Sequence, residues 1–137
     1  MVIIVLSVLS WIALIDARTH RIPNRQVFIL SIAAFFAAAA EGHSFQKHLN
    51  AALIVLFFAG LLSIFCGLGL GDVKLMGVLA MFVLPSQAST YKIFLFTVAI
   101  TAMAYAVFLS QGDLRKSLQI PLAPAILCGT IAALLTK

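Results

Sequence analysis

Six apolar stretches separated by short charged loops are the feature that most limits what this chain can fold into. They cover residues 1–15, 26–40, 49–66, 75–88, 93–109 and 120–135. None has a polar face with a period of 3.6 residues, and helices that are apolar all round belong in lipid or in the centre of a bundle. The alternating ten-residue pattern of a membrane barrel does not occur. The stretches therefore predict an all-α, polytopic membrane helix bundle with about six transmembrane helices.

Composition excludes the soluble alternatives. Of the 137 residues, 64% are apolar and 9% are charged, whereas an ordinary soluble domain is roughly 45–50% apolar and about 25% charged. Several stretches are shorter than the ~20 residues that cross a bilayer comfortably. We therefore expect their helices to include flanking residues or to lie in a locally thin bilayer. Residues 1–137 are predicted to form a single membrane-embedded domain.

The distribution of lysine and arginine predicts the orientation in the membrane. Loops one, three and five (16–25, 67–74 and 110–119) hold six of the nine basic residues, and the even loops together with the C-terminus hold three. Because cytoplasmic loops retain positive charge, the odd loops are predicted to be cytoplasmic and both termini to lie outside. No basic run is long enough to form a nucleic-acid-binding face, so the net charge of +5 is attributed to topology.

No metal or cofactor is expected. Cys66 and Cys128 each stand alone inside an apolar stretch, without the paired spacing of a zinc site or a disulfide framework. We interpret both as small buried apolar side chains.

Only four acidic residues occur, which makes a short list of candidates for catalysis. Glu41 and Asp113 lie in loops among other polar residues, where solvated side chains are expected. Asp16 directly follows an apolar run, and Asp72 follows the glycine-rich segment 67–71. Both are predicted at the membrane boundary, where an acid is costly and indicates a function. The predicted topology puts them on the same membrane face.

Each of these two acids also has a structural interpretation. Asp16 could pair with Arg18 or Arg21 at the interface, and Asp72 could cap a helix N-terminus or pair with Lys74. The nearby glycines fit either the close approach of an extended peptide or tight helix packing.

Two facing carboxyl groups have a known chemical use. Like charges at short range do not both ionise easily, so the pair shares a proton near neutral pH. The ionised member can then activate water while the protonated member polarises a peptide carbonyl. This chemistry hydrolyses an amide without a metal or a covalent intermediate.

The segments around the two acids resemble the prepilin peptidase family, the type IV leader peptidases, which are membrane aspartic proteases of the GxGD type. Asp16-Ala17-Arg18-Thr19-His20-Arg21-Ile22-Pro23-Asn24 is similar to the family's acid followed by I-P-N. Gly69-Leu70-Gly71-Asp72-Val73-Lys74-Leu75 is similar to its GxGDxKL segment. The segment IPLAPA at 120–125 is similar to the start of the family's last helix.

The resemblance implies that Asp16 and Asp72 are the catalytic pair, and that Gly69 and Gly71 shape the loop around Asp72. Lys74 matches the family's lysine, and it could hold Asp72 ionised or meet an acidic substrate.

The remaining residues of loop one have weaker assignments. Pro23 is expected to end the loop by disfavouring helix at Ile22. Asn24, with Arg18 and Arg21, is either a substrate contact or a topology anchor. His20 is interpreted as a solvated loop residue.

The implied substrate is a membrane-anchored prepilin, of type IV or Flp type, with a short basic leader. It would be cleaved at the cytoplasmic face of the bacterial inner membrane, in pilus biogenesis and protein secretion. The chain is similar to the short, peptidase-only members, so no methyltransferase domain is expected.

Three other interpretations stay open. Intramembrane acids and glycine-interrupted helices also mark small proton- or ion-coupled transporters. A non-catalytic assembly subunit could use the acids for pairing between helices. An archaeal preflagellin peptidase would share the GxGD element and differ mainly in its substrate. The sequence does not predict the oligomeric state.

Overall fold

The computed structural model describes residues 2–20, 22–42, 44–66, 69–85, 87–110 and 121–136. Over these residues the chain forms helices and no strand, so the prediction of an all-α fold with six helices is confirmed. The helices are α1 (Val2–Thr19), α2 (Asn24–Ala40), α3 (Phe45–Cys66), α4 (Leu70–Phe82), α5 (Ala88–Ser110) and α6 (Ala123–Leu135).

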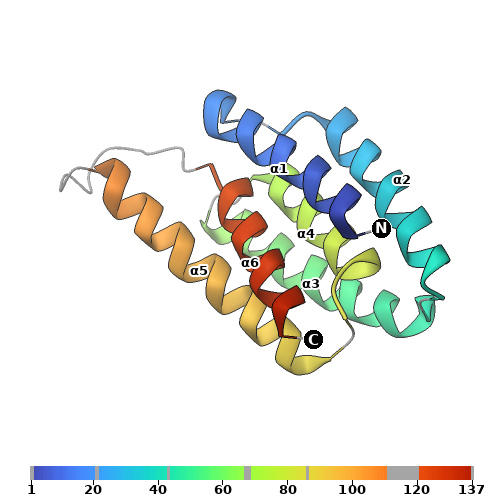
Figure 1. The fold of residues 1–137 in the computed structure, drawn as a ribbon. Helices are drawn as coiled ribbons and strands as arrows, with labels where there is room; N and C mark the ends of the chain where they lie inside the picture. The colour runs from blue at the N-terminus through green and yellow to red at the C-terminus, as the bar shows by residue number, and fades with distance from the viewer. Residues whose placement is uncertain are drawn as a thin grey trace.

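Successive helices run in opposite directions (Figure 1). The C-terminal ends of α1, α3 and α5 therefore lie at the same end of the bundle as the N-terminal ends of α2, α4 and α6. We call this the α1–α2 end, after the connection found there. Described residues of loops one and three meet at it, as the alternation of the predicted loops requires.

α4 and α6 are the inner helices of the bundle. α4 packs between α2 and α3, α6 packs between α1 and α5, and contacts of α1 with α2 and of α4 with α6 join the two groups. Leu75 and Leu79 of α4 and Ile126 of α6 are fully buried. Gly129 brings α6 close to α5, because a Cβ there would lie 2.5 Å from Val98 Cγ2 and 3.0 Å from the Phe94 carbonyl oxygen.

The outward faces of the described helices are apolar. The large apolar side chains that are more than half exposed include Ile3, Phe28, Phe36, Phe57, Ile64, Phe96 and Phe108. Two helical segments, Val2–Thr19 and Ala88–Phe108, are long and apolar enough to cross a membrane, whereas Asn24–Ala40, His48–Ile64 and Ala123–Leu135 are apolar but shorter. An exposed apolar surface of this extent fits contact with lipid.

Several predicted boundaries are wrong. α1 continues to Thr19, so Asp16 lies in a helix rather than in loop one, and α4 begins at Leu70, which puts Asp72 in its first turn rather than in loop three. α3 and α5 also begin earlier than their apolar stretches. Apolarity marks the part of a helix that can contact lipid, whereas the helix itself continues because backbone groups near the boundary still need hydrogen-bond partners.

The predicted end of the fourth helix is also wrong, because the apolar stretch 75–88 extends beyond the last residue of α4. α4 ends at Phe82, and the buried residues Val83 and Leu84 follow it in a turn ahead of Pro85. Proline disfavours helical backbone in the residue before it. The helix therefore ends before Pro85, although the residues that follow it are still apolar.

The interpretation of Cys128 is also wrong. Its side chain is exposed on the outer face of α6, whereas its neighbours Gly129 and Thr130 face inward. The side chain of Cys66, and the predicted loop residues Arg21 and Asp113, lie outside the part of the chain that is described.

Candidate active site

Asp16 lies in the last turn of α1 and is 4% exposed. Its Oδ2 accepts a hydrogen bond from the backbone N–H of Ala123, the first residue of α6, at 3.0 Å. The first N–H groups of a helix have no partner within the helix, and the helix dipole favours negative charge there. The Asp16 carboxylate therefore supplies a hydrogen-bond acceptor for the N-terminus of α6, although the two residues are 107 positions apart in the sequence.

Asp72 lies in the first turn of α4 and is half buried. Its Oδ1 is buried and accepts no hydrogen bond from the described residues. Gly69, rather than Asp72, is the N-cap residue of the helix, so the capping interpretation of Asp72 is wrong. A Cβ on Gly69 would lie 2.8 Å from Asp72 Oδ2. The missing side chain of Gly69 is therefore what leaves room for the carboxyl group in this position.

The two acids interact electrostatically, although they are 56 positions apart (72 minus 16). Asp72 precedes the apolar stretch 75–88 and lies outside both helical segments that are long enough to cross a membrane. Burial raises the pKa of Asp72 to about 7, and the negative charge of Asp16 adds to the rise. Asp72 can therefore hold its proton at a pH where an ordinary aspartate is ionised.

Loop one packs directly on the glycine-rich start of α4. A Cβ on Gly71 would lie 3.0 Å from the Cβ and 3.5 Å from the carbonyl oxygen of Ile22. Ile22 is not helical, and Pro23 is the extended residue that caps α2 (φ −65°, ψ 134°). The segment with I-P-N and the segment with GxGD are therefore in contact at the α1–α2 end.

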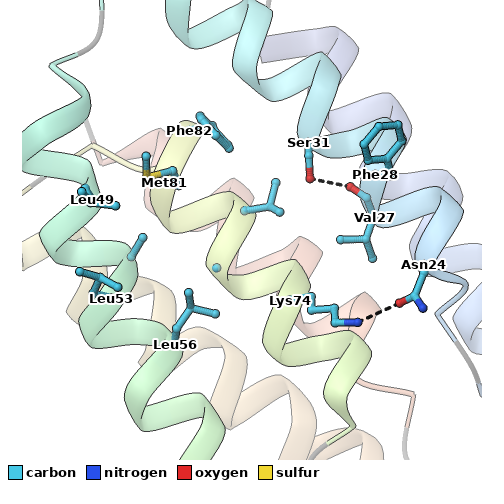
Figure 2. Close-up of a pocket in the computed structure, with 13 residues that line it drawn as sticks. Asn24, Val27, Phe28, Ser31, Leu49, Leu53, Leu56, Lys74, Met81 and Phe82 are labelled. Atoms are coloured by element: carbon cyan, nitrogen blue, oxygen red, sulfur yellow. Dashed lines mark hydrogen bonds between the residues drawn. The ribbon is translucent and has the colours of Figure 1, made fainter.

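Lys74 joins the same two segments, but it does not contact Asp72. Its Nζ donates a hydrogen bond to Oδ1 of Asn24 at 3.1 Å (Figure 2). Because an α-helix turns about 100° per residue, Lys74 lies on nearly the opposite face of α4 from Asp72. The pKa of Asp72 is raised by burial and by Asp16. The structure thus places the Lys74 ammonium as a link between α4 and α2 rather than as a counter-ion to Asp72.

His20 and Arg18 lie close to Asp16 in sequence and are both exposed. His20 has a left-handed backbone conformation (φ 51°), and its N–H donates to the carbonyl oxygen of Asp16 at 2.8 Å. This bond closes the end of α1. Its ring is near enough to interact electrostatically with the Asp16 carboxylate.

The role of Ala123 cannot be predicted from residue types, because the group that contacts Asp16 is a backbone N–H and not a side chain. The one signal available was the proline-containing segment 120–125, because prolines mark the start of a helix. That segment indicated a helix start but gave no partner for it.

One comparison with known proteins identifies a family. The model of the type IV leader peptidase family matches residues 3–110, which is most of the chain. None of the curated proteins or solved structures matches. The matched range contains both acids, the I-P-N segment and the GxGD segment. The chain therefore belongs to the type IV leader peptidase family.

Proposed function

We propose that this chain is an aspartic endopeptidase that removes the N-terminal leader of type IV or Flp-type prepilins. Membership of the family makes it a peptidase. The observation that carries the aspartic mechanism is the meeting of two carboxyl groups from different helices at one end of the bundle, where burial and the charge of Asp16 raise the pKa of Asp72 to about 7. A pair that holds one proton between them is suited to acid–base hydrolysis of an amide.

The surroundings of the two acids favour different roles. The Asp16 carboxylate accepts a backbone N–H at a helix N-terminus, and such a bond stabilises the ionised form. Asp72 has a buried oxygen that finds no donor in the described part of the chain, which favours the protonated form. In the resting pair, Asp16 is therefore the general base and Asp72 the general acid.

These roles give a balanced reaction. Asp16 takes a proton from a water molecule as the water oxygen adds to the scissile carbonyl carbon, and Asp72 gives its proton to the carbonyl oxygen. When the tetrahedral intermediate collapses, the C–N bond breaks and Asp16 returns the proton to the leaving nitrogen. Asp72 recovers its proton from the hydroxyl group that becomes the new carboxyl group.

We also propose that the apolar stretches of all six helices lie in the bacterial inner membrane, with Asp72 at its cytoplasmic boundary and loops one, three and five in the cytoplasm. The apolar outer faces of the bundle support this, as does the meeting of both acids at the α1–α2 end. Cysteine labelling tests the orientation. Ser44→Cys is expected to react from outside the cell and Ser117→Cys only from the cytoplasm, and the reverse pattern would invert the proposed topology.

The experiment for the activity uses purified protein and a candidate prepilin in detergent. We expect one cut immediately before the apolar helix of the prepilin, identified by sequencing the new N-terminus, and the same rate with a metal chelator present. A cut elsewhere, or no product from a panel of prepilins, would contradict the proposal. Uptake of a solute driven by a proton gradient, without a cleaved product, would point to a transporter instead.

A further inference from the structure

α2 and α3 are consecutive in the chain, yet their backbones do not pack against each other in the described ranges. Both helices pack against α4, and they leave a slot between them over the outer face of α4 (Figure 2). The slot is an open cavity of about 500 Å³, and its walls include Phe28 of α2, Leu53 of α3 and Met81 of α4. A bundle helix would normally fill such a space.

The slot is closed at the end away from the two acids. The ring of Phe35 in α2 stacks on that of Phe45 in α3 at a centroid distance of 5.9 Å, and Phe82 of α4 lies 6.0 Å from Phe35. At the α1–α2 end, the hydrogen bond from Lys74 of α4 to Asn24 of α2 crosses the slot. Aromatic rings thus close one end of the slot, and its other, polar end lies beside the segment that carries Asp72.

The chemistry of the slot suits an apolar helix. Phe28 is 66% exposed and Leu53 is 56% exposed. The hydroxyl of Ser31 donates to the carbonyl oxygen of Val27 and so offers no free donor. Lys74 is the charged residue of the lining, and an ammonium group has three N–H donors, of which one is used on Asn24. Donors for backbone carbonyls are therefore found only at the polar end.

Resting on the function proposed above, we propose that this slot holds the apolar transmembrane helix of the substrate. A helix about 10 Å wide placed there would contact α2, α3 and α4 together. The substrate chain would leave its helical conformation at the polar end, where Lys74 can donate to its carbonyl oxygens.

Because Lys74 and Asp72 lie on nearly opposite faces of α4, the substrate chain must pass around this helix to reach the two acids. The extended substrate chain has to cross the start of α4, where Gly69 and Leu70 are both exposed. An extended chain advances about 3.3 Å per residue, so crossing a helix about 10 Å wide takes about three residues. The first residues after the scissile bond, about three of them, therefore cross the start of α4 in extended form, and the part of the apolar segment that follows them is seated in the slot.

Disulfide cross-linking tests the slot directly. Cysteine is introduced at Leu53, or at Phe96 of α5 as a matched control that is 68% exposed on another face. The background carries Cys66→Ala and Cys128→Ala, with Asp72→Asn to keep the prepilin uncut. We expect cross-links from position 53 to prepilin cysteines spaced three to four residues apart, and none from position 96. Equal cross-linking at both positions would indicate that lipid fills the slot and would contradict the proposal.

A kinetic test separates the slot from the activity itself. Leu53→Trp narrows the slot and is expected to raise KM for the prepilin at least about tenfold, the loss of about 1.4 kcal/mol of binding, with little change in kcat. Phe96→Trp is expected to change neither. If the wild-type chain cleaves the prepilin and Leu53→Trp has an unchanged KM, the slot proposal is wrong and the proposed function stands. If the wild-type chain cleaves no prepilin, both are wrong.

Discussion

The backbone N–H of Ala123 donates to the carboxylate of Asp16 at 3.0 Å, and this bond ties the last turn of α1 to the first turn of α6. α6 lies beyond the residues that match the family, yet its first N–H group holds one of the two acids in place. Substitutions at position 16 that keep a hydrogen-bond acceptor should therefore affect stability differently from those that remove it.

Asp16→Asn keeps an acceptor oxygen for the Ala123 N–H, and we expect its thermal unfolding midpoint to equal or exceed that of the wild type. Asp16→Leu leaves the N–H group buried without a partner, which costs about 1–3 kcal/mol. Thermal unfolding of the two variants in the same detergent measures the difference. Equal midpoints for both variants would show that the bond does not stabilise the fold.

Gly69→Ala tests the space beside Asp72. The backbone of Gly69 (φ −62°, ψ 134°) is open to alanine, but the new Cβ would lie 2.8 Å from Asp72 Oδ2. The carboxyl group can rotate away at small cost to the fold, so we expect nearly unchanged stability and at least about a tenfold lower kcat, equivalent to about 1.4 kcal/mol.

Gly60→Ala is the matched control for this substitution. Nothing lies within 4 Å of a Cβ at that position in α3, and alanine is favoured over glycine inside a helix by roughly 0.5–1 kcal/mol. We expect Gly60→Ala to be slightly more stable and fully active. Full activity of Gly69→Ala would contradict the placement of the Asp72 carboxyl.

The raised pKa of Asp72 predicts a pH dependence. The mechanism needs Asp72 protonated, so cleavage should decline as the pH rises above about 7. A carbodiimide, which reacts with protonated carboxyl groups, should label Asp72 with a midpoint near pH 7. In Asp16→Asn the repelling charge is gone, so the pKa of Asp72 and the labelling midpoint should fall. A midpoint near 3.8, the ordinary pKa of an aspartate, in the wild type would show that Asp72 is not perturbed.

The same shift has a consequence for stability. Between about pH 4 and pH 7 the folded chain holds the Asp72 proton more tightly than the unfolded chain does. The free energy of unfolding should therefore fall as the pH rises through this range. Asp72→Asn, which has no proton to lose there, should remove this part of the slope.

Lys74 and Asn24 should act as one unit. Lys74→Ala and Asn24→Ala each remove the same hydrogen bond between α4 and α2. A bond of this kind contributes about 0.5–1.5 kcal/mol. We expect the double variant to be no less stable than the less stable single variant, as measured by thermal unfolding against Lys92→Ala, an exposed lysine of α5. Additive losses would show that the two side chains act independently.

The sequence was sufficient to predict the number of helices from the apolar stretches. It was also sufficient to predict that the two acids lie at the same end, because successive loops alternate between the two ends of the bundle. It could not place Asp72 in a helix, since a glycine-rich segment reads as loop although Gly69 ends the loop and starts α4. It paired Lys74 with Asp72 by proximity in sequence, whereas helical geometry turns the two residues apart. The bond from Ala123 to Asp16 was out of reach, because a backbone donor leaves no signature in residue type.

The central claim is that Asp16 and Asp72 together hydrolyse the substrate's peptide bond. The most direct measurement is the rate of prepilin cleavage by purified Asp16→Asn, Asp72→Asn and, as a control, Glu41→Gln, whose carboxyl group lies after the end of α2, away from the α1–α2 end. The account predicts that both aspartate variants remain folded and form no product, while Glu41→Gln cleaves at the wild-type rate. Near wild-type cleavage by either aspartate variant would contradict it.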